Sequence, residues 1–381
     1  MSQEFTDEQE LLRDSMVNLM ESEEWESYFR QCDDEGKFPD RYYRALRETG
    51  LFDILIPEEQ GGLGGDFVTF VAAWEALLEH GGSAAPIWAA LLPYETLRDG
   101  TPEQVAKIRK SLDEYPTVPV CSAFTEPSGG SDLGSYSTTY ERKNGKVYLN
   151  GSKTFVTDGV DAEYAVVLAR DAETGEKHTR WLVPLKEGRK GLEVSQLHGK
   201  LGLRTNTLAE FFFTDLELDE SDMLGNEGQA FEDVKKDFNI ERLVQPIYHY
   251  GYALYAYEEA MRYANQREAF GQTIGRFELM QEKIAVMASN LAASRALLYE
   301  TARKLDEGSL GPAEAGICKY FIQSHCFTTL DEAMQIMGGV GIVESSRISR
   351  CWRDVRADKI AGGTAEMVAL AAARAELKRF R

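Results

Sequence analysis

The segment from Cys121 to Thr139 holds the residues best suited to bind a small ligand. It reads CSAFTEPSGGSDLGSYSTT and combines hydroxyl side chains with the pair Gly129–Gly130. Hydroxyls and backbone N–H groups can hydrogen-bond a planar or phosphorylated ligand, and glycines let such a ligand approach the backbone. An ordinary polar loop has the same composition, so the residues alone leave both interpretations open.

The second feature that could take part in a reaction is a carboxylate next to a guanidinium, Glu241–Arg242 in FNIERL. A positioned carboxylate can take or give a proton, and burial against apolar groups raises its pKa toward neutrality. An arginine that points inward opposes that shift. A charged helix face produces the same sequence, so this pair also has two interpretations.

Other kinds of site lack their sequence signatures. Neither phosphate-binding fingerprint, G-x-G-x-x-G or G-x-x-x-x-G-K-[ST], occurs, and H-E-x-x-H and G-x-S-x-G are absent. The five histidines and five cysteines are scattered without ligand spacing, so we expect neither a metal site nor a disulfide. A formal net charge of −21 disfavours nucleic acid, and the apolar runs are too short for a membrane span.

Hydrophobic spacing predicts the elements that position these residues. The pattern is helical from Thr6 to about Lys110, and short β-type runs follow from about Val118 to Leu224. Two dipeptides within the β region, Asn144–Gly145 and Asn150–Gly151, are hairpin turn signals. The first ten residues show no targeting pattern, which predicts a cytoplasmic protein.

Helical patterns return at Gln229 and continue to Arg381, with breaks at Gly271–Gly275, Gly308–Pro312 and Gly338–Gly341. At 381 residues the chain is long enough for several domains. We therefore predict an α+β protein with an N-terminal helical domain (1–118), a middle β domain (119–228) and a C-terminal helical domain (229–381).

The string TEPSGGSD resembles the signature of the acyl-CoA dehydrogenase family. Further strings of that family occur in the same order along almost the whole chain: IPEEQGGLGG, NGSKTFVTDG, KLGLRTNT, YANQREAFGQTIGRFELMQEK, MQIMGGVGI and RISRCWRDVRADKIAGGT. The resemblance implies a β-barrel-like middle domain, a C-terminal four-helix bundle, bound FAD and a homotetramer. Within the family the chain looks most like the crotonobetainyl-CoA reductase type, above all over Tyr263 to Glu282 and Arg347 to Met367.

The resemblance also assigns flavin contacts position by position. Those implied within one subunit are Phe124, Thr125, Gly130, Ser131, Phe155 and Thr157. Further FAD contacts are implied for Arg267, Phe270, Ile274, Phe277, Gln335, Gly339, Thr364 and Glu366, of which Arg267, Phe270, Gln335 and Gly339 would reach the FAD of a neighbouring subunit. Phe155 replaces the tryptophan commonest at its place, and a plain helix C-cap is the alternative for Gln335 and Gly339.

The family's usual catalytic glutamate directly precedes the Gly-Thr of its C-terminal motif, and this chain has Gly362 there. Relatives without that glutamate often place one directly before the arginine of the first C-terminal helix, which here is Glu241. The resemblance thus implies Glu241 as the base and the backbone N–H of Gly362 as the donor to the thioester carbonyl. It implies Ser131, Asn239, Arg242 and Gln245 as substrate contacts.

The implied function is that of an FAD-dependent acyl-CoA dehydrogenase or enoyl-CoA reductase, which exchanges electrons through an electron-transfer flavoprotein. If Tyr248 faces the acyl tail, the pocket is short and favours a small acyl group. One alternative is a flavoprotein of the same fold that uses oxygen or another acceptor. Another is an inactive scaffold, since the usual base is missing at Gly362.

Overall fold

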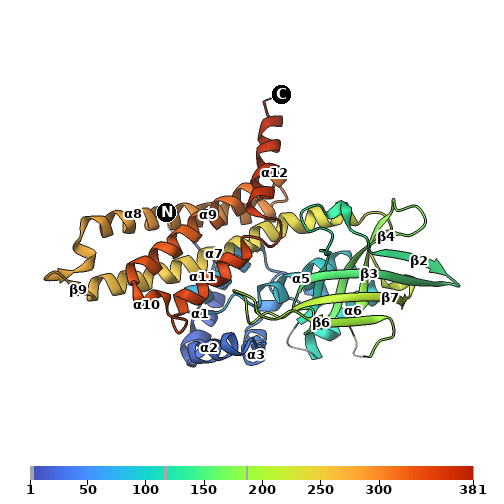
Figure 1. Ribbon diagram of the computed structural model, residues 1–381, viewed down its shortest axis with the longest axis horizontal. Coiled ribbons are helices and arrows are strands. Elements are labelled where there is room, and N and C mark those ends of the chain that lie inside the picture. Colours follow the sequence, from blue (N-terminus) through green and yellow to red (C-terminus); the bar gives the residue numbers. More distant parts are fainter. Residues whose placement is uncertain (1–3, 115–117, 186–187, 381) are drawn as a thin grey trace.

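Helices, then strands, then helices follow one another along the chain in the computed structural model, which describes residues 4–114, 118–185 and 188–380 (Figure 1). The first group of helices comprises α1 Asp7–Ser22, α2 Trp25–Glu35, α3 Asp40–Glu48, α4 Phe67–Glu79, α5 Ile87–Asp99 and α6 Pro102–Glu114. Helix α1 begins with a capping box, in which the side chains of Thr6 and Gln9 accept hydrogen bonds from each other's backbone N–H groups. Helix α4 is buried on almost every face, so it forms the centre of this domain.

The middle of the chain forms a mixed β-sheet. Its strands are β1 Val118–Ala123, β2 Thr139–Lys143, β3 Lys146–Thr157, β4 Ala162–Asp171, β5 His178–Pro184, β6 Leu192–Gln196, β7 Leu208–Leu218 and β8 Met223–Leu224. They lie in the order β6-β7-β3-β2-β4-β5-β8, and β1 pairs in parallel with β4. Short 3-10 helices are η1 Leu51–Asp53, η2 Glu58–Gln60, η3 Leu133–Ser135, η4 Glu220–Asp222 and η5 Ile274–Arg276.

One predicted turn in the β region is confirmed and the other is wrong. Asn144 and Gly145 have φ angles of 54° and 76° and join β2 to β3. The predicted turn at Asn150–Gly151 does not exist, because β3 runs through it and the register against β7 shifts there instead. A Cβ on Gly151 would lie 2.5 Å from Thr138 Oγ1. Glycine is therefore needed here because the backbone at the bulge lies close to Thr138.

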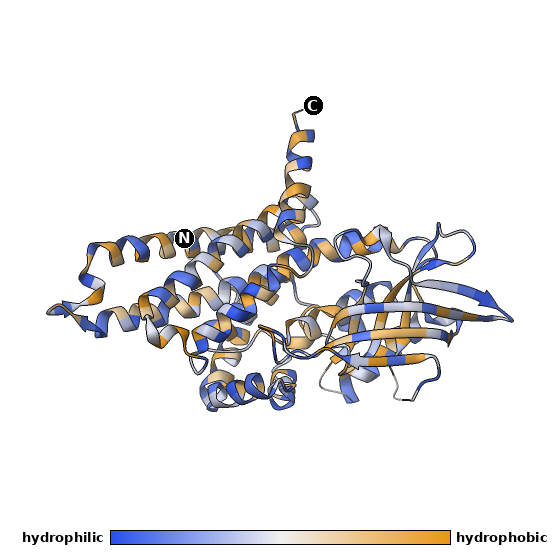
Figure 2. Cartoon of the chain, in the orientation of Figure 1, coloured by the Kyte–Doolittle hydropathy of each residue, from blue (hydrophilic) through white to orange (hydrophobic). Residues whose placement is uncertain are grey.

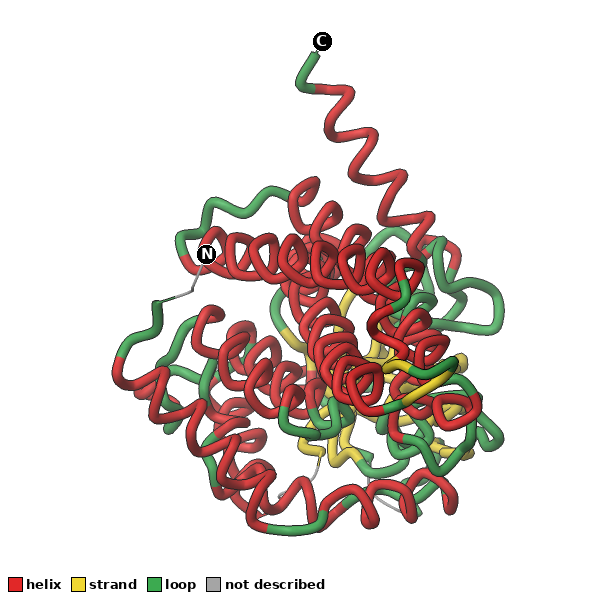
Figure 3. The backbone as a smooth tube through the Cα atoms, turned by 90° about the vertical axis from the view of Figure 1, so that its left-hand side faces the viewer, coloured by secondary structure: helices red, strands yellow, loops and turns green. Residues whose placement is uncertain are grey.

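The C-terminal domain is built on long helices. Its elements are α7 Ala230–Gln266, β9 Glu268–Ala269, β10 Gln272–Thr273, α8 Glu278–Asp306, α9 Pro312–Met337, α10 Gly339–Ile342, α11 Arg347–Asp358 and α12 Ala365–Lys378. Helices α7, α8, α9 and α11 pack side by side. Helix α12 packs against α9 through Val368 and Ala372, and its C-terminal end projects away from the other helices in two perpendicular views (Figures 1 and 3). The breaks at Gly271 and Gly338 are confirmed by their φ angles of 80° and 57°.

Apolar residues occur along both the strands and the helices, whereas the tip of the β2–β3 hairpin is hydrophilic (Figure 2). The chain changes from helix to strand at Val118 and back to helix at Ala230. These positions lie near the predicted domain limits, which themselves stay a prediction. Within residues 4–114, 118–185 and 188–380, no helix combines the length and the apolar composition that crossing a membrane requires.

Candidate active site

A cavity of about 1100 Å³ lies where the helical and β domains meet. Its walls come from the start of α5, the loop after β1, the end of β3, one face of α7 and the segment between α11 and α12. The two features that could do chemistry in the sequence, the hydroxyl-rich loop and Glu241–Arg242, therefore face the same space.

The hydroxyl-rich loop is held by a buried carboxylate. Glu126 accepts hydrogen bonds from Lys153 Nζ at 2.8 Å and from the backbone N–H groups of Ser137 and Thr138 at 2.6 and 2.9 Å. Burial alone would raise the pKa of Glu126, but these bonds, with Lys153 first, lower it to about 2. Lys153 also donates to the carbonyl of Phe124 at 3.2 Å. This ion pair fixes the loop that runs from Phe124 to Ser131.

An aromatic ring opposite this loop is unusually exposed. Phe155 has a φ of 55° and lies where the β3–β7 register shifts, and 64% of its surface is exposed. The ring borders the cavity together with Thr125, Gly130 and Thr157. This wall suits a planar heterocycle that stacks on the Phe155 ring and accepts hydrogen bonds from the hydroxyls of Thr125 and Thr157. These residues therefore fit the flavin ring of FAD.

The α7 wall carries the candidate base. Phe238, Glu241, Arg242, Gln245 and Tyr248 all line the cavity, because residues at this spacing share one face of a helix. Glu241 is only 7% exposed, and no described residue hydrogen-bonds its carboxylate. Burial raises the pKa of Glu241 to about 7, with a further rise from the Asp237 charge; Lys319 and then Arg242 oppose the shift. Burial thus outweighs Arg242, which the sequence left open.

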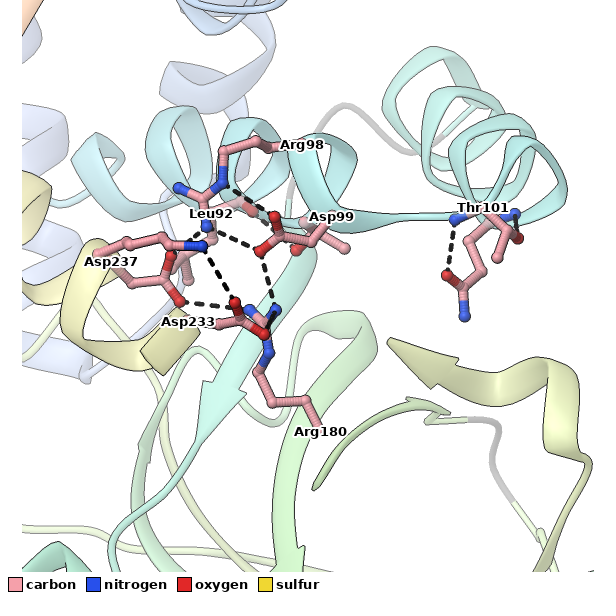
Figure 4. Close-up of polar contacts among 10 residues, drawn as sticks. Leu92, Arg98, Asp99, Thr101, Arg180, Asp233 and Asp237 are labelled. Atoms are coloured by element: carbon pink, nitrogen blue, oxygen red, sulfur yellow. Dashed lines mark hydrogen bonds and ion pairs between the residues drawn. The ribbon is translucent and has the colours of Figure 1, made fainter. Parts of the chain in front are cut away.

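Asp237, one helical turn before Glu241, belongs to a network of ion pairs shown in Figure 4. Its carboxylate lies 2.6 Å from Arg98 Nη2 on α5 and 3.4 Å from Arg180 Nη1 on β5. Arg180 Nη2 also lies 2.8 Å from both Asp99 and Asp233. The network joins α5, β5 and α7 beside the cavity, so it fixes the helix that carries Glu241 against the β domain.

Gly362 lies opposite Gln245. Gly362 and Gly363 have φ angles of 58° and 86°, and a Cβ on Gly362 would lie 2.7 Å from the Gln245 side-chain amide. Lys319 Nζ, buried on α9, donates to the carbonyls of Ala361, Gly362 and Gly363 at 2.9, 2.8 and 3.0 Å. Lys319 thus fixes the three carbonyls of this segment, while the N–H of Gly362 has no hydrogen-bond acceptor among the described residues.

The structure brings many of the predicted site residues to the cavity and leaves others outside. Those that line it are Phe124, Thr125, Gly130, Ser131, Phe155, Thr157, Glu241, Arg242, Gln245, Gly362 and Thr364. Those that do not are Asn239, Arg267, Phe270, Ile274, Phe277, Gln335, Gly339 and Glu366. Most of the second group lies near β9 and α10, at the end of the helices away from the sheet (Figure 1). The roles assigned to both groups stay predictions.

Sequence reasoning missed Lys319, the Glu126–Lys153 pair and Asp358, a cavity-lining carboxylate that accepts a hydrogen bond from Gln245 Nε2 at 3.1 Å. A signal existed for Lys319, since it shares a helix face with the apolar Ala315 and Ile322, where a charge needs internal acceptors. No such signal exists for Glu126–Lys153, because 27 residues separate the partners in the chain.

Family models match three consecutive stretches of the chain. They are the N-terminal domain of acyl-CoA dehydrogenase over residues 6–112, the middle domain over 121–216 and the C-terminal domain over 228–377. Together they span nearly the whole chain, and the cavity lies among the three matched parts. The chain therefore belongs to the acyl-CoA dehydrogenase family of oxidoreductases.

Solved structures of that fold resemble the whole molecule. Butyryl-CoA dehydrogenase from Megasphaera elsdenii is 26% identical with a TM-score of 0.91, over 99% of this chain and 100% of that one. A glutaryl-CoA dehydrogenase solved with glutaryl-CoA is 26% identical with a TM-score of 0.92, over 99% and 97%. The prolyl acyl carrier protein oxidase AnaB is 26% identical with a TM-score of 0.90, over 97% and 99%.

Proposed function

We propose that the protein is an FAD-dependent oxidoreductase that exchanges two hydrogens across the α and β carbons of a coenzyme A thioester. The observation that carries the proposal is the Glu241 carboxylate, which is buried, unpaired among the described residues and of pKa about 7. It shares its cavity with the residues that fit a flavin and with Gly362. Two of the similar solved structures are named as dehydrogenases of CoA thioesters, butyryl-CoA dehydrogenase and glutaryl-CoA dehydrogenase.

The chain's own residues account for the proton transfer. FAD, when bound, supplies the acceptor for the hydride that leaves the β carbon. Glu241 takes the proton from the α carbon, and in the reverse direction it returns the proton to that carbon. The free N–H of Gly362 donates to the thioester carbonyl, which lowers the energy of the enolate-like charge that develops there. Lys319 holds that N–H in place through the carbonyls of the same segment.

The finer features of the proposal rest on the sequence. The strings around Tyr263 to Glu282 and Arg347 to Met367 support an enzyme of the crotonobetainyl-CoA reductase type, located in the cytoplasm. An electron-transfer flavoprotein is the proposed electron partner. Tyr248 lies in the cavity wall and is 2% exposed, which supports a small acyl group because its ring closes that part of the space.

We propose a homotetramer as the working assembly. Phe270 is 96% exposed at the β9–β10 turn, and the projecting helix α12 leaves Leu370 and Leu377 43% and 63% exposed. Surfaces of this kind are covered in stable oligomers. Light scattering on the purified protein tests this, since a mass near four times 42.7 kDa supports the tetramer and a monomer mass contradicts it.

A flavoprotein oxidase is the second candidate, because the prolyl acyl carrier protein oxidase AnaB shares the fold over 97% of this chain. Mixing the substrate-reduced protein with air separates the two functions. Slow reoxidation in air, with fast reoxidation by an electron-transfer flavoprotein, supports the dehydrogenase. Fast reoxidation by oxygen alone supports the oxidase, and a protein that stays colourless after reconstitution with FAD contradicts both.

A further inference from the structure

Glu95, in helix α5, is a buried carboxyl without a partner of its own. Its side chain is 5% exposed, and its Oε1 has no hydrogen-bond partner among the described residues. Arg98, nearly one turn further along the same helix, pairs with Asp99 and Asp237 instead. A buried carboxyl without a cation lowers stability, and a glutamine of the same shape would avoid that loss. Glu95 is therefore a candidate for a functional acid that the site described above does not include.

Helices α5 and α7 run in opposite directions beside the cavity. The backbone N–H of Ala84, just before α5, donates to the Tyr252 hydroxyl of α7 at 2.8 Å. Near the other end of α5, Arg98 Nη2 lies 2.6 Å from the Asp237 carboxylate, as Figure 4 shows. An early position beside α5 thus meets a late position of α7, and a late position of α5 meets an early one of α7. These contacts fix the register between the two helices.

This register places Glu95 opposite the candidate base. Glu95 lies nearly one turn before Arg98 on α5. Glu241 lies one turn after Asp237 on α7, which runs the other way. Leu92, on the same face of α5 as Glu95, lines the cavity that Glu241 also lines. Burial raises the pKa of Glu95 well above its usual range, and the charges of Asp237 and Glu241 raise it further.

The cations around the two carboxyls already have other partners. Arg98 and Arg180 both pair with Asp237, and Lys319 donates to three backbone carbonyls. The charged neighbours that act on the two carboxyls are Asp237, Arg98, Arg180, Arg242 and Lys319. Two facing carboxyls without a cation of their own resist ionising together, so the pair keeps one proton near neutral pH.

We propose that Glu95 is a positioning residue for the reaction, a second carboxyl that shares one proton with Glu241. The proposal rests on the proposed function and adds a residue to the same site. Near neutral pH Glu95 keeps the proton, so the Glu241 carboxylate is free to take the α proton of the substrate. In the reverse direction the shared proton moves from Glu95 to Glu241 and from there to the α carbon. The pair then takes one proton from solvent.

A thermodynamic cycle tests the shared proton without any substrate. Urea unfolding of the FAD-loaded wild type, Glu95→Gln, Glu241→Gln and the double variant is measured from pH 5 to 9. Protonated Glu95 stabilises the folded state, and this contribution is lost as the pH rises through its raised folded pKa. Glu95→Gln therefore gains stability over its parent until that pKa is passed.

The Glu241 charge delays the ionisation of Glu95 in the wild type only. The gain from Glu95→Gln should therefore level off at a pH at least about one unit lower when Glu241→Gln is also present. It should also be smaller there at pH 9. Equal gains at every pH in the two backgrounds overturn the proposal and leave the proposed function standing.

Glu79→Gln is the matched control for this cycle. Burial raises the pKa of Glu79 on α4 too, but the like charges beside it belong to Glu75 and Glu258. Its gain in stability should be the same in the wild type and in Glu241→Gln. A gain that depends on the background at Glu79 as well would trace the Glu95 result to a general change in the fold and overturn the assignment.

The reductive reaction gives a readout that a purely structural role of Glu95 would not move. Protein reduced with dithionite is mixed anaerobically with but-2-enoyl-CoA, and the rate of flavin reoxidation is measured from pH 6 to 10. Above pH 7, where Glu241 ionises, the wild type should approach a constant rate because the shared proton still reaches Glu241. Glu95→Gln should lose about tenfold in rate per pH unit there, since Glu241 alone must then hold the proton.

Parallel pH profiles for the wild type and Glu95→Gln overturn the proposal. Absence of reoxidation in both proteins contradicts the proposed function, and the thermodynamic cycle then decides by itself whether the two carboxyls share a proton.

Discussion

Replacing Glu241 by glutamine should change how the stability of the protein depends on pH. The carboxylate is buried, and its pKa rises from 4.5 to about 7 on folding. The folded state then binds more protons than the unfolded state between these values. The stabilising contribution of the protonated group is complete below pH 4.5 and is lost as the pH rises through 7. Glutamine does not titrate, so Glu241→Gln removes this loss.

The size of the effect follows from the shift. Each pKa unit corresponds to about 1.4 kcal/mol, so the rise to about 7 predicts a difference of about 3 kcal/mol. At pH 5 the variant should be more stable than the wild type by less than about 1 kcal/mol, because the unfolded-state carboxyl begins to ionise near pH 4.5. At pH 8 the variant should be more stable by about 3 kcal/mol, because the wild type there holds a buried, unpaired charge.

Urea unfolding of both FAD-loaded proteins at pH 5, 6, 7 and 8 measures this difference. Titrating groups far from Glu241 act equally in the two proteins, so they cancel when the curves are subtracted. Glu95 and Lys319 feel the Glu241 charge and contribute to the difference together with it. Glu282→Gln, at an exposed position on α8, is the control and should give a difference that does not vary with pH. Parallel curves for wild type and Glu241→Gln from pH 5 to 8 would refute the raised pKa.

Three further variants test the parts of the protein that form the cavity walls. Asp237→Asn removes a charge that raises the pKa of Glu241, so the acid limb of the kcat/KM profile for acyl-CoA oxidation should move to lower pH; an unmoved limb contradicts this coupling. Lys153→Met removes the cation that pairs with the buried Glu126 carboxylate and leaves it only the hydrogen bonds from Ser137 and Thr138, so we expect about 3–5 kcal/mol less stability and weaker FAD retention in urea and ultrafiltration measurements. A stability equal to the wild type would exclude that role. Gly362→Ala places a methyl group 2.7 Å from the Gln245 amide at a φ of 58°, so the free energy of unfolding should fall by about 1 kcal/mol or more. Unchanged stability with full activity would show that the backbone of this segment shifts to accept the methyl group.

The parts of this molecule that the sequence predicts well are those that depend on local pattern. The helix–strand–helix order follows from spacing, and the turn at Asn144–Gly145 follows from residue types that adopt positive φ. Asn150–Gly151 has the same residue types, yet it lies within β3, since the pairing of that strand with β7 outweighs the local turn preference.

The site depends on contacts between distant parts of the chain, which a local pattern does not contain. Family strings indicated Glu241 and Gly362, but the sequence did not reveal whether burial or Arg242 dominates the pKa of Glu241. That balance depends on burial and on Lys319, whose charge reaches Glu241 only after α7 and α9 pack together, whereas Asp237 lies one turn away on the same helix. The unpaired Oε1 of the buried Gln245 side chain is likewise a property of the packed fold.

The central claim is that Glu241 takes the α proton of an acyl-CoA thioester as the flavin is reduced. The most direct test is anaerobic mixing of the FAD-loaded wild type and Glu241→Gln with a panel of saturated acyl-CoAs. The account predicts loss of the flavin band in the wild type and no measurable reduction in Glu241→Gln, although the variant retains FAD. Reduction of Glu241→Gln at the wild-type rate would contradict it.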